Sequence, residues 1–502
     1  MSEKYKFRGG QIIEYGGCNF YYSHMKNNMT QGSPFALLLG FTLPTFIGNI
    51  FQQFYLMADT LIVSRLLGVN ALAAVGAVSG YSFMVTGMAQ GLTMGFTAII
   101  AQRFGAGDER GMRKAYANGT ILSLLISVIL ALVFALFSMP LLRLINTPEN
   151  IIDMANDYIM VIYVFLITSV MYNFYAGVLR SMGDSRSPLV FMIISAVLNI
   201  ALDIISIIWF GWGVRGAAIA TVFSQGVAAV LSFIYIKRKY PEFKCSKEEW
   251  KFDRRLSRTL LSVGMPGAVQ YSVTAISVII VQIATNGFGS DSVAAYSCAS
   301  KIETIATQFY PALGLAISSY ASQNLGAGKT DRIRKGFRIS VYLDIAYSVI
   351  GLAACQLLAA PCTYLFVENT PENAQIISES VMYVKNIGWF FIPLGSIFIF
   401  RTGCQGLGSG KIPLLSATLE LIARLSTAFS LTRLYGFYGI CLSNACSWIT
   451  AGCILPFVYL HYMKKIELRL GKSARLSYNK TNCMLTDNID FCYFSSVAKE
   501  GR

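Results

Sequence analysis

Residues Asn146–Asn150 read NTPEN, and the same five letters return at Asn369–Asn373, 223 positions later. Each copy has the composition of a helix start, because a threonine such as Thr147 or Thr370 suits the N-cap position. The proline that follows suits the first helical position, where its missing amide proton removes no hydrogen bond. A helix start alone does not require the surrounding sequence to repeat as well.

The flanking sequence does repeat, with nearly the same offset. QRFGAGDERGMRK, which begins at Gln102, corresponds to QNLGAGKTDRIRK, which begins at Gln323. SMGDSRSP, which ends at Pro188, corresponds to GLGSGKIP, which ends at Pro413. The paired segments lie between 221 and 225 positions apart, so the chain consists of two copies of one unit.

The composition indicates a polytopic membrane protein. Of the 502 residues, 54% are hydrophobic and only 13% are charged, against about 25% charged residues in soluble domains. Twelve apolar segments are long enough to cross a bilayer. They are 34–64, 70–101, 115–139, 150–180, 188–209 and 213–237, then 258–285, 292–322, 337–361, 374–404, 412–433 and 437–463. The expected fold class is therefore an all-α polytopic membrane protein with twelve transmembrane helices in two six-helix lobes.

The net charge of +15 follows the predicted topology rather than a nucleic-acid site. The odd-numbered loops between helices carry only four basic residues, Arg65, Arg143, Arg215 and Arg433. The opposite side collects the other basic segments, including nine basic residues between positions 237 and 258. This asymmetry predicts that both termini are cytoplasmic, and an even number of spans in each half makes the two repeats parallel.

The predicted organisation follows from these boundaries. It comprises a cytoplasmic N-terminal segment at 1–33, an N-lobe at 34–237 with helices 1–6, a basic cytoplasmic linker at 238–257, a C-lobe at 258–463 with helices 7–12, and a disordered cytoplasmic tail at 464–502. The first segment lacks the charged and apolar regions of a cleaved signal peptide.

Several other chemistries are not expected. GAGKT at Gly326–Thr330 resembles the end of a phosphate-binding loop, but Gln323 stands where that pattern needs a glycine, so no ATP-binding site is expected. The two histidines, His24 and His461, lie at the margins of the predicted core, and the eleven cysteines show no CxxC spacing. We therefore expect neither a catalytic residue nor a metal site, apart from a coupling ion.

Two acidic residues fall within predicted spans of the first half. A charge at the centre of a transmembrane helix costs about 2.5–3.5 kcal/mol on insertion scales, so each needs a reason. Asp59 shares a helix face with Tyr55 and Gln52, which precede it by four and seven residues. Asp203 shares a face with Asn199, four residues earlier. The alternative is that these side chains only join helices through hydrogen bonds.

Depth along the predicted helices places these groups at one level. Counted from the outer ends of their helices, Asp59, Asp203, Thr221 and Tyr158 all lie roughly 9–12 Å below the boundary at 1.5 Å per residue. Asp59 and Asp203 can hold a proton, and their oxygens with those of Asn199 and Thr221 can instead ligate Na⁺. If they do, the N-lobe holds an ion-coupling site.

The second half does not repeat this set, because Val281 and Ala428 stand at the positions equivalent to Asp59 and Asp203. It carries instead Glu420 and a basic residue four positions later, Arg424, a spacing that favours a salt bridge. A self-neutralised buried pair and a functional role both remain open for it. Three further charges near or within spans have no assigned role: Lys301, Glu303 and Asp344.

These features together resemble the multidrug and toxic compound extrusion (MATE) family of transporters. The resemblance runs from about Ser33 to His461 and rests on four motifs taken in order. They are PTFIGNIFQQFYLMADT in helix 1, the twin Q-x-x-GAG loops, LRSMGDSRSP with CQGLGSGKIP, and NIALD in helix 5. The resemblance implies a V-shaped pair of lobes that exchange cationic, amphipathic compounds for H⁺ or Na⁺.

The resemblance also implies roles for single residues. It identifies Asp59 with the helix 1 coupling aspartate. It assigns Asn199, Asp203 and Thr221 to the N-lobe cation site, and Tyr158 and Asn173 to the hydrogen-bonding groups around it. NorM-type members carry acidic residues in helices 7 and 10, which are absent here, so the chain is expected to be closer to the DinF-like branch.

The leading hypothesis is therefore a secondary antiporter of the cell membrane, not an enzyme. Its expected partners are small organic cations and membrane lipid, without nucleic acid, ATP or a cofactor other than the coupling H⁺ or Na⁺, and the chain is expected to be monomeric. One alternative is a lipid-linked oligosaccharide flippase of the same superfamily, for which Arg401 and Arg424 are the only indications. An integral membrane enzyme is a weaker alternative, because no reactive cluster is visible.

Overall fold

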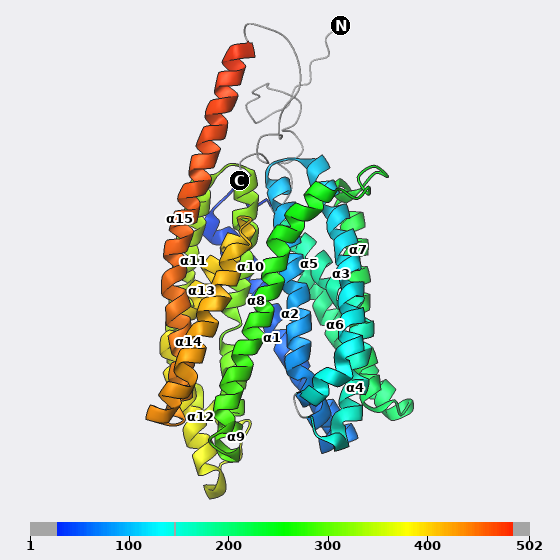
Figure 1. Ribbon diagram of the computed structural model, residues 1–502, viewed down its shortest axis with the longest axis vertical. Coiled ribbons are helices and arrows are strands. Elements are labelled where there is room, and N and C mark those ends of the chain that lie inside the picture. The colour runs from blue at the N-terminus through cyan, green and yellow to red at the C-terminus, as the bar shows by residue number, and fades with distance from the viewer. Residues whose placement is uncertain (1–27, 145–146, 485–502) are drawn as a thin grey trace. The chain divides into compact units, whose positions relative to one another are not determined.

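The computed structural model describes residues 28–144 and 147–484, and all regular elements within them are helical (Figure 1). The chain divides after Leu455 into two compact units, of which the first contains both sequence repeats. The helices of the first repeat are α1 Pro34–Leu67, α2 Val69–Gly105, α3 Glu109–Leu144, α4 Glu149–Val164, α5 Leu166–Ser181, α6 Arg186–Ile204, the π-helical turn η2 Ile205–Trp209 and α7 Gly213–Lys239.

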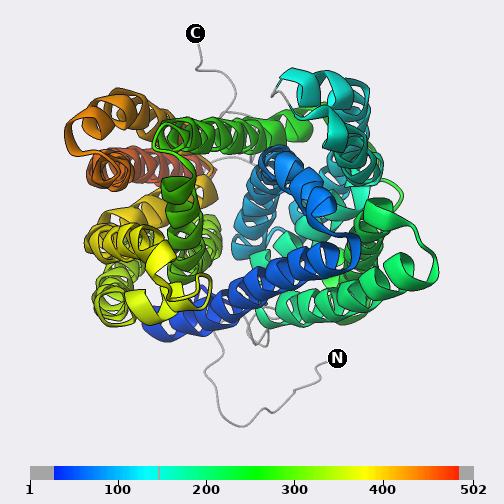
Figure 2. The same cartoon turned by 90° about the horizontal axis from the view of Figure 1, so that it is seen from below.

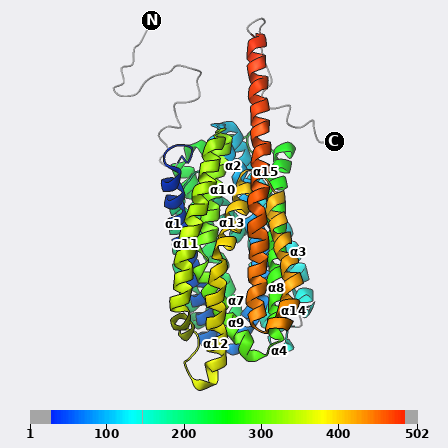
Figure 3. The ribbon, with the colours of Figure 1, turned by 90° about the vertical axis from the view of Figure 1, so that its left-hand side faces the viewer.

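A short linker helix, η3 Pro241–Phe243, leads into the second repeat. Its helices are α8 Arg254–Asn286, α9 Ser290–Ala306, α10 Phe309–Gly326, α11 Thr330–Tyr364, η4 Pro371–Asn373, α12 Ala374–Ile387, η5 Gly388–Phe390, α13 Phe391–Gly406, α14 Lys411–Tyr435 and α15 Tyr438–Met484. Figure 2 shows α2 to α7 gathered on one side and α9 to α14 on the other, with α1 crossing between them and packing against α10 and α11. Figure 3 shows α10, α11 and α13 side by side, and they pack against one another.

The helices support the predicted polytopic fold. Within the described residues, ten helices or helix runs are long and apolar enough to cross a membrane, and α4 with α5 makes an eleventh span bent by 48°. The remaining predicted span, 292–322, is divided between α9 and α10, which are separated by two residues. By the repeat offset, the bend between α4 and α5 corresponds to the 3₁₀ turn η5 between α12 and α13, whereas the break between α9 and α10 falls where α2 is continuous in the first repeat.

The two NTPEN segments differ in detail from the predicted helix start. In the first copy α4 begins at Glu149 and Pro148 occupies the N-cap position, so the predicted cap at Thr147 is wrong by one residue. In the second copy Thr370 does precede a helical turn, the 3₁₀ turn η4. Neither start has a side-chain cap hydrogen bond. The extended backbone of Pro148, with ψ of 138°, keeps that residue out of the helix.

The twin Q-x-x-GAG loops meet each other at one end of the molecule. A Cβ atom at Gly105 would lie 1.9 Å from the carbonyl oxygen of Gln323, and a Cβ at Gly326 would lie 1.9 Å from that of Gln102. Only glycine permits this approach of α2 and α10. The two copies of the loop found in the sequence therefore pack against each other, and each glycine contacts the glutamine backbone of the other copy.

The glutamine side chains of these loops tie the repeats together in the same reciprocal way. Gln102 Nε2 donates to the Gly406 carbonyl oxygen at 2.7 Å, and Gln323 Nε2 donates to the Ser181 carbonyl oxygen at 2.8 Å. Gln323 Oε1 also accepts from the backbone nitrogen of Met29 at 2.9 Å. We call the two glutamine-to-carbonyl bonds the glutamine clasp.

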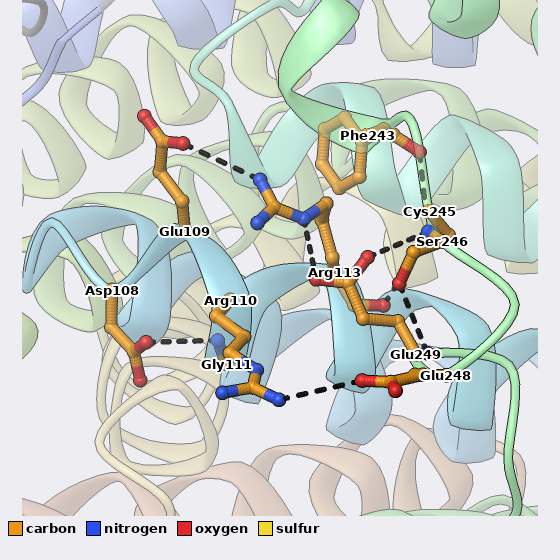
Figure 4. A network of polar contacts seen from close by, with 10 residues as sticks. All are labelled: Asp108, Glu109, Arg110, Gly111, Arg113, Phe243, Cys245, Ser246, Glu248 and Glu249. Carbon is orange, nitrogen blue, oxygen red and sulfur yellow. Dashed lines mark hydrogen bonds and ion pairs between the residues drawn. The ribbon is translucent and has the colours of Figure 1, made fainter.

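The basic linker is folded onto the start of α3 (Figure 4). Arg113 Nε donates to Glu249 Oε1 at 2.7 Å, and the backbone nitrogen of Ser246 donates to Glu249 Oε2 at 2.8 Å. Burial alone raises the pKa of the Glu249 carboxyl, but the hydrogen bonds from Arg113 and Ser246 outweigh it and hold the pKa below its ordinary value. Asp253 then caps α8 by accepting from two backbone nitrogens. The linker is thus a structured connection.

The last helix differs from the prediction at its end. The sequence places the end of the last span at 463 and predicts disorder from 464, but α15 continues to Met484. Residues 464–484 begin with Lys, Glu, Leu and Arg, which are good helix formers, and extending an existing helix needs no new nucleation. The remainder of the predicted tail, 485–502, and most of the N-terminal segment, 1–27, lie outside the described residues.

Candidate ion-coupling site

The two predicted aspartates come together inside the first repeat. Asp59 lies on α1 and is 6% exposed, and Asp203 lies in the last turn of α6 and is fully buried. Their carboxyl groups are within hydrogen-bonding reach of each other. One oxygen of each, Oδ1, has no other hydrogen-bond partner among the residues that the structure describes. Because two bare carboxylates repel at this separation, the contact is favourable only when a proton or another cation lies between them.

Asn199 positions the second aspartate. It lies one helical turn before Asp203 and is also fully buried. In the amide orientation that satisfies both of its ends, its nitrogen donates to Asp203 Oδ2 at 2.9 Å and its oxygen accepts from the Thr221 backbone nitrogen at 3.1 Å. The amide thus fixes one carboxylate oxygen of Asp203 and leaves the other free, while it joins α6 to α7.

A local helix distortion follows the buried aspartate. The α-helical pattern of α6 ends at Ile204 and continues as the π-helical turn η2. Ser206 Oγ donates to the Asp203 backbone carbonyl at 3.2 Å within this distortion. Single π-helical turns are rare and occur often at functional sites. Sequence reasoning missed this feature, because the run of isoleucines around it has no distinguishing pattern.

Aromatic hydroxyls complete the surroundings of the carboxyl pair. Tyr55, one turn before Asp59, is half-buried, and its hydroxyl is hydrogen-bonded to the Thr221 side chain. Tyr158 on α4 is 7% exposed and lies within electrostatic range of both aspartates. The structure therefore assembles Asp59, Asn199, Asp203, Thr221, Tyr55 and Tyr158 in one place, as the sequence predicts.

Two predicted members of the supporting network lie elsewhere. Gln52 is exposed and makes no side-chain hydrogen bond within the described part of the chain. Asn173 lies on α5 and lines a separate cavity between α2, α5 and α10, where its nitrogen donates to the Ser169 carbonyl at 2.9 Å.

The predicted salt bridge in the second repeat is formed with a different arginine. Glu420 Oε1 pairs with Arg401 of α13 at 3.2 Å and also accepts from Ser416 at 3.1 Å. Arg424 makes no ion pair with any described carboxylate, and its Nε has no hydrogen-bond partner. The prediction of a pair between Glu420 and Arg424 is therefore wrong. The spacing of four residues permits that pair, but the packing of α13 against α14 brings Arg401 to the Glu420 carboxylate instead.

The acidic residues that had no assignment form two further clusters. Glu303 Oε2 accepts from the Tyr383 hydroxyl at 2.8 Å, and Asn444 donates to the same hydroxyl at 2.8 Å. Arg424 lies within electrostatic range of Glu303. Asp344 on α11 is 1% exposed and accepts from Ser348 at 3.2 Å. Both clusters belong to the second repeat, and sequence spacing gave no signal that linked their members.

Comparison with known proteins decides the family. The MatE family model matches residues 44–205 and 266–430, which correspond to the two repeats. A probable multidrug resistance protein of Bacillus subtilis, YoeA, is 30% identical over 376 residues, which cover 74% of this chain and 80% of that protein. This chain belongs to the MATE family. Relatives such as YoeA are described as multidrug resistance proteins, and this chain is accordingly a multi-pass membrane transporter rather than an enzyme.

Other MATE-family relatives cover more of the chain. A probable multidrug resistance protein NorM of Thermotoga maritima is 26% identical and covers 87% of this chain and 92% of that protein. A protein of Shewanella oneidensis described as an FAD transporter is 26% identical over 77% of this chain and 84% of its own length. These matches leave the predicted DinF-like branch as a prediction.

Solved structures confirm the fold. A MATE transporter crystallised in complex with MaL6 superposes with a TM-score of 0.82 at 22% identity and covers 88% of this chain and 99% of that chain. A transporter from Pyrococcus furiosus, whose description refers to the reverse polarity of its binding pocket, gives the same TM-score and coverage. The chain thus has the MATE fold along almost its entire predicted membrane region.

Proposed function

We propose that this MATE-family protein is an antiporter that exports cationic, amphipathic organic compounds in exchange for protons at the Asp59–Asp203 pair. The observation that carries the proposal is the contact between the two buried carboxyl groups. Such a pair holds one proton readily and loses it when a competing cation enters the site. The proposed location is the cell membrane, with both termini in the cytoplasm.

The exchange follows from linkage between the proton and the exported cation. If the two ligands favour different states of the transporter, or compete for the same carboxylates, each lowers the affinity for the other by the same factor. Each positive charge that crosses the membrane also changes the free energy by about 2.3 kcal/mol per 100 mV. Asn199 and Thr221 keep Asp203 oriented toward Asp59 through this cycle.

Sodium is the second candidate for the coupling ion. The free Oδ1 atoms of both aspartates, with the hydroxyl of Thr221, are hard oxygen ligands of the kind that alkali and alkaline-earth cations take. A sodium ion between Asp59 and Asp203 would remove the same repulsion as a proton. The geometry of the site suits either ion, and an experiment with separate gradients distinguishes H⁺ from Na⁺.

The flippase alternative has less support. Its expected phosphate-binding groups were Arg401 and Arg424, but Arg401 is neutralised by Glu420 at 3.2 Å. Arg424 lies within electrostatic range of Glu303, so it too has a nearby compensating charge. Neither arginine offers an uncompensated positive charge to a lipid-linked pyrophosphate.

The proposed function is tested with the variant Asp59→Asn. Asparagine keeps the shape and hydrogen bonding of the side chain but cannot release a proton. Inverted vesicles that contain the wild-type protein should accumulate rhodamine 6G when a proton gradient is imposed, and vesicles with Asp59→Asn should not. A sodium gradient imposed separately distinguishes the second candidate.

A matched control separates coupling from general damage. Asp157 lies on α4 of the same repeat, but its carboxylate pairs with Arg215 at 2.6 Å near the protein surface. Asp157→Asn should retain transport, and the melting temperature in detergent should be close to wild type for both variants. Gradient-driven transport by Asp59→Asn at the wild-type rate would contradict the proposal.

A further inference from the structure

The cavity between α2, α5 and α10 contains a positive charge that the proposed cation site does not explain. The space open to the centres of water-sized molecules is about 30 Å³, within a recess of about 450 Å³ that includes open solvent, and both repeats line it. Among the described residues that line it, Arg180 is the only charged one. Asp59 and Asp203 do not line this cavity, so their carboxylates do not neutralise it there.

No acid in the described part of the chain compensates the guanidinium of Arg180. Within the described residues it makes no ion pair, and the Tyr172 phenol is the one titratable group with an electrostatic influence on it. The side chain is half-buried rather than extended into bulk solvent. A planar guanidinium with free N–H groups binds carboxylate and phosphate oxygens well, often through two parallel hydrogen bonds.

The opposite wall of the cavity supplies hydrogen-bond donors. Ser318 and Ser319 of α10 are 6% and 9% exposed, and neither hydroxyl makes a hydrogen bond within the described structure. Neither hydroxyl is sealed from solvent, because both residues line the cavity. The Gln90 amide, from α2, is a further uncommitted donor in the lining. An arginine, two hydroxyls and an amide without a carboxylate form a donor-rich surface for an oxyanion.

We propose that this cavity binds the anionic group, a carboxylate or phosphate, of an amphipathic solute, with Arg180 as the positive charge and Ser318 and Ser319 as hydroxyl donors. The binding site is distinct from the Asp59–Asp203 pair and extends the substrate range beyond cations. It takes the chemical group that the cation site would repel.

The proposed oxyanion site lies next to the contacts that join the two repeats. Ser181 and Ser322 line the cavity, and both take part in the contacts beneath it. The Ser181 carbonyl accepts from Gln323 in the glutamine clasp, and Ser322 Oγ donates to the Gly406 carbonyl at 2.8 Å. A ligand held by α5 of one repeat and α10 of the other therefore favours the state in which the clasp is formed.

The test uses two dyes that share a xanthene ring system but differ in charge. The purified full chain in phosphatidylcholine nanodiscs is titrated into anionic carboxyfluorescein or cationic rhodamine 6G, and binding is followed by fluorescence polarisation. We expect Arg180→Gln to raise the dissociation constant for carboxyfluorescein about tenfold or more, the usual effect of losing a charge-assisted hydrogen bond. The same variant should not weaken rhodamine 6G binding.

Two controls make the result specific. Arg186→Gln removes the same charge from an exposed neighbouring position outside the cavity, and carboxyfluorescein binding should change by less than about twofold. Arg180→Lys keeps the charge without the planar fork, so its affinity should fall between wild type and Arg180→Gln. Equal carboxyfluorescein affinity in wild type and a folded Arg180→Gln variant, or no binding by wild type, overturns the proposal.

Competition distinguishes the sources of the oxyanion. Displacement of carboxyfluorescein by inorganic phosphate assigns the site to soluble oxyanions, and displacement only when phosphatidylglycerol is added to the nanodiscs assigns it to a lipid headgroup. Either result supports the proposal if the displacement is lost in the Arg180→Gln variant. Asp59→Asn should retain carboxyfluorescein binding, so failure of the proposed antiport and failure of the oxyanion site give different results.

Discussion

At the scale of single residues, the candidate coupling site depends on what each aspartate oxygen contacts. The Asn199 amide nitrogen donates a hydrogen bond to Asp203 Oδ2, so Asp203 Oδ1 stays available for Asp59 or for an ion between them. The same amide accepts from the Thr221 backbone, so a single side chain sets both the orientation of the carboxylate and the spacing of α6 and α7. It is a positioning residue and carries no charge itself.

Asn199→Ala should therefore reduce transport without abolishing it. The variant loses a hydrogen bond to each of two groups, at about 0.5–1.5 kcal/mol apiece, and the sum of about 1–3 kcal/mol corresponds to a decrease in rate of about 5- to 150-fold. Asp203→Asn removes the charge itself and should abolish gradient-driven uptake of rhodamine 6G, as Asp59→Asn should. Vesicle transport rates for the three variants, normalised to protein in the membrane, measure the difference. An Asn199→Ala variant as inactive as Asp203→Asn would show that the amide does more than position.

The sequence predicted most of the site's members but not all of their contacts. Helical spacing and depth located Asp59, Asp203, Asn199 and Thr221 correctly, because both follow from the geometry of a single helix. The partner of Glu420 could not be found in this way. It depends on which neighbouring helix packs against α14, and α13 places Arg401 there. The same reason explains why Glu303 and Tyr383 were not linked in advance.

At the scale of elements, the Arg401–Glu420 pair joins α13 to α14 in the second repeat. Both side chains are at most 10% exposed, so each compensates the buried charge of the other. Breaking a buried pair by removing one partner costs about 3–5 kcal/mol, because it leaves an uncompensated charge. We expect Glu420→Gln to lower the melting temperature and the expression level before it changes ion coupling. Glu372→Gln, at the exposed turn η4, serves as the control and should melt like wild type. A wild-type melting temperature for Glu420→Gln contradicts the expected role.

The linker contact between Glu249 and Arg113 gives a pH dependence with a definite sign. The pKa of Glu249 is held below its ordinary value of 4.5. A carboxyl with a lowered folded-state pKa contributes stability that is complete above the unfolded-state value and is lost as pH falls through the folded-state value. The difference in melting temperature between wild type and Glu249→Gln should therefore be present at pH 7 and shrink below about pH 4.5.

The neighbouring Glu248 provides the control for this experiment. Its carboxylate lies 3.9 Å from Arg110, and both side chains are more than two-thirds exposed. Exposed ion pairs of this kind contribute little, so Glu248→Gln should melt like wild type at every pH. A difference for Glu249→Gln that stays constant from pH 7 to pH 3.5 would show that the carboxylate charge does not stabilise the linker.

At the scale of the whole molecule, the duplication seen in the sequence becomes a pair of reciprocal contacts. The sequence predicted equivalent loops on one side of the membrane, and the structure brings those loops together through the backbones of α2 and α10. It could not predict that each glutamine binds a carbonyl of the opposite repeat, because spacing within a repeat contains no information about contacts between repeats. Which side of the membrane these loops face stays a prediction from the basic residues.

The close approach of the two loops predicts how single methyl groups should affect transport. Alanine at Gly105 or Gly326 would place a Cβ 1.9 Å from the carbonyl oxygen of the facing helix, so the backbones of α2 and α10 would have to separate. If the proposed antiporter works by alternating access, the repeats close at this end in one state, and we therefore expect both substitutions to lower transport to a similar extent. Gly76→Ala, on the same helix as Gly105 but with nothing within 4 Å of its new Cβ, should transport normally.

The conformational cause can be measured directly with a reporter cysteine in the oxyanion cavity. Ser319→Cys would be labelled by a membrane-impermeant maleimide added at the end of the molecule where the twin loops meet. If the added methyl groups prevent closure, labelling should be several-fold faster in the Gly105→Ala and Gly326→Ala backgrounds than in the Gly76→Ala background. Reduced transport with unchanged labelling would place the defect in folding or in the chemistry of the site. Normal transport in both variants would show that the contact between the loops is not needed for the cycle, since the two glycines are equivalent by the repeat and must act alike.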